Sequence, residues 1–227
     1  TDIAISCSGS DFSGIFGETF NATIQNITVA GGQVSTNAKN VGGLVAFAKN
    51  TNIEGIDIHI AGLKTTGGSG ENVGGVAGKV SGTSKLSTCN VKIGFTLVAS
   101  SGKANTMGGI VGLTQSSITS SNNNGKINVH VVTSDESVFT GNNYPVNVGG
   151  ISGGAPIDAT GATGADITSC VNNGEITCVT YCKGTVPTCG GIVGHPGYED
   201  ASQNNLITRC ENKAKITATT FAIARVG

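Results

Sequence analysis

A six-residue phrase recurs along the 227-residue chain and constrains its fold more than any other feature. It reads large apolar, Gly or Ser, Gly, aliphatic, variable, Gly or Ala, and its clearest copy runs from Val148 to Gly153. The copies start at positions 12, 41, 73, 107, 148 and 189. Self-similarity at a spacing of tens of residues is typical of a repeat array, in which each unit buries its apolar face on its neighbours. Residues 1–227 are therefore predicted to form a single repeat array.

Alternating segments between the phrases predict short strands. Ile56 to Ile60 and Ile127 to Val131 place aliphatic side chains on one face and polar ones on the other. With the phrase and a second aliphatic block, we expect three strands in each unit. Few Asn-Gly turns occur at hairpin spacing, which disfavours the alternative of a β-meander. The sequence predicts an all-β, right-handed parallel β-helix of about six coils, with glycine-rich corners and variable loops.

The glycine pair of each phrase is predicted to form a corner. Val148 and Ile151 are both apolar, yet a flat strand would send them to opposite faces. A bend at the intervening pair would bring both inside, and glycine accepts positive φ and close backbone approach. The predicted corner glycines are Gly42, Gly43, Gly74, Gly75, Gly108, Gly109, Gly149, Gly150, Gly190 and Gly191.

Both ends of the sequence resemble parts of a unit. Ile3 to Cys7 is similar to the last segment of a unit, and Val226-Gly227 is similar to the start of a phrase. We therefore expect a segment of a longer array. Its open strand edges would stack end to end on neighbouring repeats or on identical chains.

Composition argues against several functional classes. Charged residues make up 12% of the chain and the net charge is −1, so there is no basic stripe for nucleic acid. No apolar run approaches the ~18 residues of a membrane span. Acidic residues are scattered, and no second pair of Cys or His completes a zinc site. We expect no enzyme, no cofactor, no metal, no nucleic-acid partner and no membrane span.

Five of the seven cysteines fall between positions 170 and 210. Cys170 and Cys210 occupy the same place in adjacent units, about 4.8 Å apart in a parallel stack, near the lower end of the disulfide range. A stack of buried thiols is the alternative. Cys178, Cys182 and Cys189 flank a long corner, which a Cys178–Cys182 or Cys182–Cys189 bridge would clamp. One of the seven cysteines must stay unpaired or pair outside the chain.

Asparagines mark two further candidate sites. Asn123, Asn172 and Asn212 align in three successive units. They predict an internal ladder, in which the amides bond one another and the corner backbone, with a ligand-binding row as the alternative. Asn21 and Asn26 each begin an Asn-x-Thr glycosylation sequon, which is typical of a secreted eukaryotic protein.

The second half of the phrase resembles the GLUG motif, which is glycine, leucine-like, hydrophobic, glycine. The resemblance covers nearly the whole chain from residue 12, with departures at Ala46 and Ser152 and in the irregular first repeat. The copies that carry it are Gly43-Leu44-Val45-Ala46, Gly75-Val76-Ala77-Gly78, Gly109-Ile110-Val111-Gly112 and Gly191-Ile192-Val193-Gly194. The resemblance implies repeats of large secreted or surface-exposed proteins, adhesin-like, and carries no catalytic residues.

These observations together predict a non-enzymatic extracellular structural or adhesive protein: a stalk, a fibre or a surface adhesin segment. Its partners would be itself, neighbouring repeats, glycans, or a host or matrix surface. A carbohydrate-binding or carbohydrate-active β-helix is the second candidate. An ice-binding protein is the third, because threonines such as Thr217 and Thr219 line outward positions.

Overall fold

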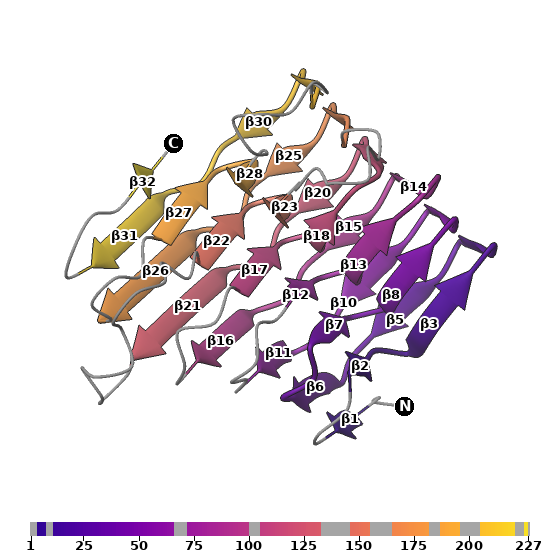
Figure 1. The fold of residues 1–227 in the computed structure, drawn as a ribbon, viewed down its shortest axis with the longest axis horizontal. Coiled ribbons are helices and arrows are strands. Elements are labelled where there is room, and N and C mark those ends of the chain that lie inside the picture. Colours follow the sequence, from indigo (N-terminus) through magenta and orange to yellow (C-terminus); the bar gives the residue numbers. More distant parts are fainter. Residues whose placement is uncertain are drawn as a thin grey trace.

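Five parallel sheets make up the whole described structure. The computed structural model describes residues 4–7, 11–65, 72–99, 105–132, 146–154, 165–181, 187–195, 205–220 and 225–226. Within these ranges the chain is all-β, and it contains no helix long and apolar enough to cross a membrane. Figure 1 shows the strands stacked side by side from the indigo N-terminal end to the yellow C-terminal end. The predicted parallel β-solenoid of about six coils is confirmed.

Sheets A and B hold seven described strands each. Sheet A consists of β1 (Ala4–Cys7), β6 (Gln33–Thr36), β11 (Gly62–Thr65), β16 (Phe95–Ala99), β21 (Ile127–Val132), β26 (Ile176–Tyr181) and β31 (Ile216–Thr220). Sheet B consists of β2 (Phe12–Ser13), β7 (Asn40–Gly42), β12 (Asn72–Gly74), β17 (Asn105–Gly108), β22 (Val146–Gly149), β27 (Pro187–Gly190) and β32 (Arg225–Val226).

Sheets C, D and E hold six described strands each. Sheet C consists of β3 (Phe16–Phe20), β8 (Val45–Lys49), β13 (Ala77–Ser81), β18 (Val111–Thr114), β23 (Ser152–Gly154) and β28 (Val193–His195). Sheet D consists of β4 (Thr23–Gln25), β9 (Asn52–Glu54), β14 (Lys85–Ser87), β19 (Ser117–Thr119), β24 (Ile167–Thr168) and β29 (Ile207–Thr208). Sheet E consists of β5 (Thr28–Ala30), β10 (Asp57–His59), β15 (Asn90–Val91), β20 (Asn122–Asn123), β25 (Val171–Asn172) and β30 (Glu211–Asn212).

Each coil therefore runs through sheets B, C, D, E and A in turn, and the prediction of three strands per unit is wrong. The glycine phrase is divided between the end of a sheet B strand and the start of a sheet C strand. The second aliphatic block is divided by a corner residue of positive φ: Asn26, Gly55, Thr88, Ser120, Ser169 and Arg209 in successive coils. Only glycine and asparagine commonly adopt this conformation, so the other four residues give no local signal of a corner.

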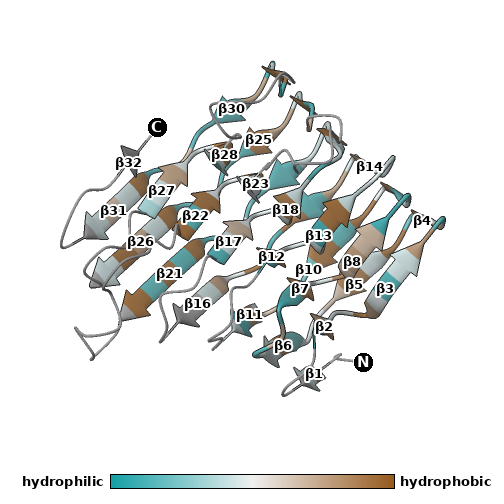
Figure 2. Cartoon of the chain, viewed as in Figure 1, coloured by the Kyte–Doolittle hydropathy of each residue, from teal (hydrophilic) through white to brown (hydrophobic). Residues whose placement is uncertain are grey.

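Parallel pairing in register turns each aligned position into a row along the stack. The inner row of sheet A, for example, pairs Leu63 with Phe95, Phe95 with Ile127 and Ile127 with Ile176. Brown and teal residues alternate along β21, as expected for a strand with one buried and one outer face (Figure 2). The rows of buried aliphatic side chains join into one continuous core.

The glycine pairs lie at the corner between sheets B and C, where Val41 and Leu44 both point into the core with 0% exposure. A Cβ on Gly42 would overlap the carbonyl oxygen of Val45, and a Cβ on Gly43 would overlap that of Gly75. Positive φ plays no part, because the described glycines with positive φ are Gly31, Gly32, Gly55 and Gly82. Glycine is required here for close backbone approach alone.

Candidate functional site

The aligned asparagines form a hydrogen-bonded row inside sheet E. Asn123 Nδ2 donates to Asn172 Oδ1 at 2.8 Å, and Asn172 Nδ2 donates to Asn212 Oδ1 at 2.8 Å. Each amide also bonds the corner backbone two residues later: Asn123 Nδ2 donates to the Gly125 carbonyl at 3.1 Å, and Gly125 N donates to Asn123 Oδ1 at 3.0 Å. Asn123 and Asn172 are fully buried, so their amides serve the fold and are closed to a ligand.

The same row is apolar in the first three coils. Val29 pairs with Ile58, Ile58 with Val91, and Val91 with Asn123. The second glycine of each phrase lies against this row: an added Cβ on Gly75 would press on Val91, and one on Gly109 would overlap Asn123. The glycine corner and the sheet E row therefore fix the width of the interior together.

Cys170 and Cys210 are free thiols in the structure, so the predicted bridge between them is wrong. Cys170 Sγ donates to the Thr168 carbonyl at 3.4 Å, and Cys210 Sγ donates to the Thr208 carbonyl at 3.3 Å. Each thiol also lies within reach of a carbonyl of the preceding coil, Ile118 at 3.7 Å for Cys170 and Ile167 at 3.4 Å for Cys210, and the two thiols stack along the row as in the alternative prediction. Burial raises the pKa of Cys170 to about 11.

Cys178 and Cys189 are also free and buried. They lie on β26 and β27, the two strands that flank the long corner, and their thiols hydrogen-bond each other inside the core. This contact, together with burial, raises the pKa of Cys178. Neither Cys178 nor Cys189 forms a disulfide bridge, and Cys182, the predicted partner of both, lies outside the described residues.

A second polar row was not predicted. Asn72 Nδ2 donates to Asn40 Oδ1 at 2.9 Å, Thr106 Oγ1 donates to Asn72 Oδ1 at 2.7 Å, and Thr188 Oγ1 donates to Asn147 Oδ1 at 2.6 Å. These residues alternate with the buried first residue of each phrase, so they lie on the outer face of sheet B. The sequence did contain the signal, because Asn or Thr directly precedes the phrase in all coils from the second to the sixth.

An exposed aromatic cluster was also missed. Phe12 and Phe47 stack with ring centroids 6.2 Å apart, and Phe20 meets Phe47 edge to face at 5.9 Å. Lys79 Nζ lies 5.7 Å from the centroid of the Phe47 ring. Phe20 is 53% exposed, and Phe16 at the other end of the same strand is 38% exposed. Phe12 and Phe20 lie in the first coil and Phe47 in the second, so the stacking of coils brings Phe47 against the other two rings.

The two sequon asparagines lie at corners of the first coil, on either side of β4. Asn21 has φ 49 and Asn26 has φ 55, and both are exposed. Asn21 Oδ1 accepts a hydrogen bond from Asn50 Nδ2 at 3.2 Å. Glycosylation of the two residues stays a prediction.

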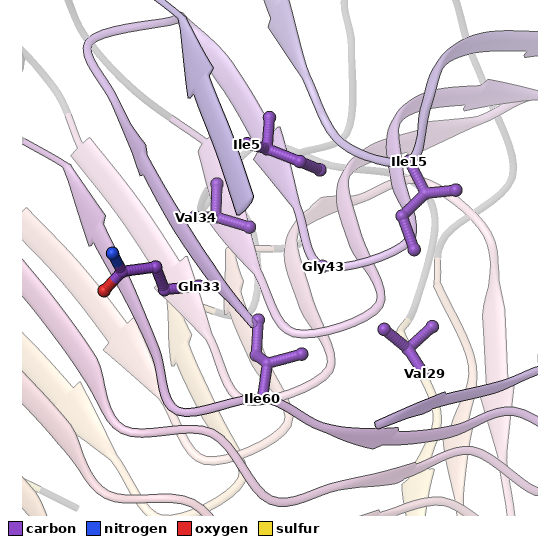
Figure 3. Close-up of a pocket in the computed structure, with 7 residues that line it drawn as sticks. All are labelled: Ile5, Ile15, Val29, Gln33, Val34, Gly43 and Ile60. Atoms are coloured by element: carbon purple, nitrogen blue, oxygen red, sulfur yellow. The ribbon is translucent and has the colours of Figure 1, made fainter. Parts of the chain in front are cut away.

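The two ends of the stack differ in shape. At the N-terminal end, side chains including Ile5, Ile15 and Val34 surround an apolar cavity of about 10 Å³ (Figure 3). The opposite end is an open apolar hollow of about 290 Å³, which we name the C-terminal end face. It is lined by Gly190, Gly191, Ile192, Val193, Ile207, Asn212 and Ile216.

The five parallel sheets and the aligned side-chain rows define the chain as a β-solenoid of stacked coils. Among the described residues, no group of three or more His, Cys, Asp or Glu side chains converges as a metal site. Comparison with known proteins found no matching family model, no matching curated protein and no matching solved structure.

Proposed function

We propose that the chain is a non-enzymatic extracellular structural or adhesive repeat protein, a segment of a stalk, fibre or surface adhesin. The observation that carries the proposal is the uninterrupted stack, in which every sheet continues in register from the first coil to the sixth. Such a stack makes a rigid spacer, because each coil is held by strand pairing, core rows and hydrogen-bonded side-chain rows. The resemblance to the GLUG motif and the exposed sequons support an extracellular location.

The test is a solid-phase binding screen of the whole chain against extracellular matrix proteins, host-cell surfaces and a glycan array. Saturable binding to a matrix protein or cell surface, without any change to the bound molecule, is the expected result. Hydrolysis or elimination of a polysaccharide by the purified chain would overturn the proposal. Thermal hysteresis of freezing would favour the ice-binding alternative instead.

Carbohydrate binding is the second candidate, and the aromatic cluster is the observation that favours it. The exposed ring of Phe20, which packs edge to face on Phe47, can stack on the apolar face of a sugar, and the amides of Asn40 and Asn72 in the adjoining sheet supply hydrogen-bonding groups. If this candidate holds, Phe47→Ala weakens selective glycan binding about tenfold. Leu113→Ala is the matched control, since Leu113 lies in the same row of sheet C two coils away. Equal effects of the two substitutions would count against a sugar platform at Phe47.

A further inference from the structure

Two rows of inward-pointing residues meet where the chain passes from sheet A to sheet B. At the end of the fourth coil these rows hold Val129 on β21 and Val148 on β22, and both valines are buried. One strand further along the stack, Cys178 pairs in register with Val129 and Cys189 with Val148. Within the described strands, both rows carry cysteine at this level alone. The chain therefore places two thiols where the preceding level has two aliphatic side chains.

The thiols of Cys178 and Cys189 are in direct contact. Both side chains are buried, and the two sulfurs hydrogen-bond each other inside the core. Cys170 and Cys210 are held differently, because each of their thiols lies within reach of two backbone carbonyls. Contact with Cys189 is the main cause that raises the pKa of Cys178, and contact with Cys178 lowers the pKa of Cys189. Cys189 is therefore the thiol of the pair that ionises first.

A bond between these two sulfurs would join two coils. β26 ends the fifth coil and β27 begins the sixth, so the chain between Cys178 and Cys189 is the connection from one coil to the next. Each of these strands pairs in register with a strand on either side, which fixes the backbone positions of the two residues. Closing a short loop in this way restricts the unfolded chain and so stabilises the folded one.

We propose that Cys178 and Cys189 form a redox site, at which a small disulfide such as oxidised glutathione converts the two thiols into a bridge between the fifth and sixth coils. The Cys189 thiolate attacks one sulfur of the small disulfide, breaks its S–S bond and releases one thiolate. The Cys178 thiolate then attacks the Cys189 sulfur of the mixed disulfide and releases the second thiolate. The two protons of the protein thiols pass to the released thiolates. The protein thus loses two electrons, and the small disulfide gains them.

Burial decides when this reaction takes place. Inside the folded core the pair is closed to a small disulfide, so the bridge forms during folding or local opening, while the two coils are apart. Once formed, a buried bridge persists in an oxidising extracellular compartment. The bridge goes beyond the proposed function, since it is independent of what the outer faces of the sheets bind.

The pairing is tested on the whole chain, refolded from urea in a buffer of reduced and oxidised glutathione. Remaining thiols are alkylated, and the protein is digested with enzymes that cut on both sides of Cys182, after Tyr181 and after Lys183. Mass spectrometry with fragmentation of the joined peptides then assigns each sulfur. We expect Cys178 joined to Cys189 as the main product. A bridge from either residue to Cys182, or alkylation of both members of the pair, would overturn the proposal.

Two variants separate this pairing from its competitors. Cys182→Ser keeps both members of the pair and should still form the bridge. Cys178→Val with Cys189→Val copies Val129 and Val148 of the preceding level, so it removes the bridge without emptying the core. On oxidation, the urea midpoint of the parent chain should rise by about 1 M. The valine variant should unfold at the same midpoint in reducing and oxidising buffer.

An unchanged midpoint in the oxidised parent chain, or an equal rise in the valine variant, would also overturn the proposal. Solid-phase binding to matrix proteins and cell surfaces is measured on the parent chain and on the valine variant in parallel. Equal binding is expected, because the pair lies inside the core. Absence of the bridge therefore leaves the adhesive function standing, and absence of adhesion leaves the bridge standing.

Discussion

The third and fourth coils solve the same packing problem in two different ways. At the corner between sheets E and A, the third coil buries Val91 and Ile93. The fourth coil has Asn123 and Gly125 at these places, and a Cβ on Gly125 would overlap the backbone of Ile93. One coil fills the interior with two apolar side chains, and the other fills it with an amide that bonds the backbone of its own corner.

The difference shows that a parallel coil accepts either an apolar or a polar interior row, provided that the row is consistent along the stack. Burial of Val29, Ile58 and Val91 has no direction, so one aliphatic can replace another at modest cost. The asparagine row is directional, because each Nδ2 needs the oxygen of the next rung. The C-terminal coils should therefore tolerate substitution less well than the N-terminal coils.

The largest expected effect comes from adding a methyl group at the glycine corner. Gly150→Ala would drive its Cβ into the side chain of Asn172 and the carbonyl of Gly191, so we expect a loss of about 3 kcal/mol or more in unfolding free energy. Gly62→Ala is the control, since its Cβ would meet only the Gly94 carbonyl at 3.5 Å. Urea denaturation measures both. A loss below about 1 kcal/mol for Gly150→Ala would refute the tight approach.

Removal of the central rung ranks next. Asn172→Val deletes the bonds to Asn123, Asn212 and Gly174 and leaves a buried Asn123 N–H unpaired, so the expected loss is about 3 kcal/mol. Ile58→Val, in the same row of the apolar half, should cost only about 1 kcal/mol. Unfolding of the two variants at the same urea concentration would contradict the difference between the asparagine row of the C-terminal coils and the apolar row of the N-terminal coils.

Two substitutions should convert the apolar corner of the third coil into the asparagine corner of the fourth. In the third coil, Val91→Asn and Ile93→Gly together recreate the Asn-x-Gly corner and give the new amide a rung at Asn123. Each single change should destabilise the chain, but the double variant should recover at least about 1 kcal/mol relative to the sum of the two. Denaturation of all four proteins completes the cycle. Simple additivity would mean that side chain and corner are not coupled.

A pH-dependent effect concerns the row that holds Cys89, Ser121, Cys170 and Cys210 in the last four coils and is apolar in the first two. Burial raises the pKa of Cys89 from 9.0 to about 12, and that of Cys170 to about 11. Above pH 9 the unfolded chain loses these protons while the folded chain keeps them, so stability falls as pH rises toward 11. The slope approaches about 1.4 kcal/mol per pH unit for each thiol.

Replacing both thiols isolates this contribution. In a Cys89→Val, Cys170→Val variant, the fall in unfolding free energy between pH 8 and pH 10.5 should be smaller than in the parent chain, since every other side chain is the same in both. Denaturation at the two pH values measures the difference. An equal fall in unfolding free energy in the two proteins would contradict the burial of the Cys89 and Cys170 thiols.

Local pattern was sufficient for the architecture and for the residues of the interior rows. The recurrence of the phrase predicted stacked coils, and the alignment of Asn123, Asn172 and Asn212 placed them in one row, because parallel stacking in register makes sequence alignment equivalent to spatial contact. The five strands per coil escaped prediction, since corners at Thr88, Ser120, Ser169 and Arg209 use residues that rarely adopt positive φ. Spacing alone left Cys170 and Cys210 between a bridge and a stack of free thiols, and the structure has the free thiols.

The sequence by itself determined the repeat, the parallel pairing and the alignment of Asn123, Asn172 and Asn212, since these depend on periodicity alone. The tertiary structure decided how the rows face one another across the interior. It set the glycines of one corner against Val91 or Asn123, directed Cys170 and Cys210 to carbonyl oxygens, and gathered Phe12, Phe20 and Phe47 on the surface. These contacts depend on the width and bend of each coil, which follow from packing between sheets rather than from any local pattern.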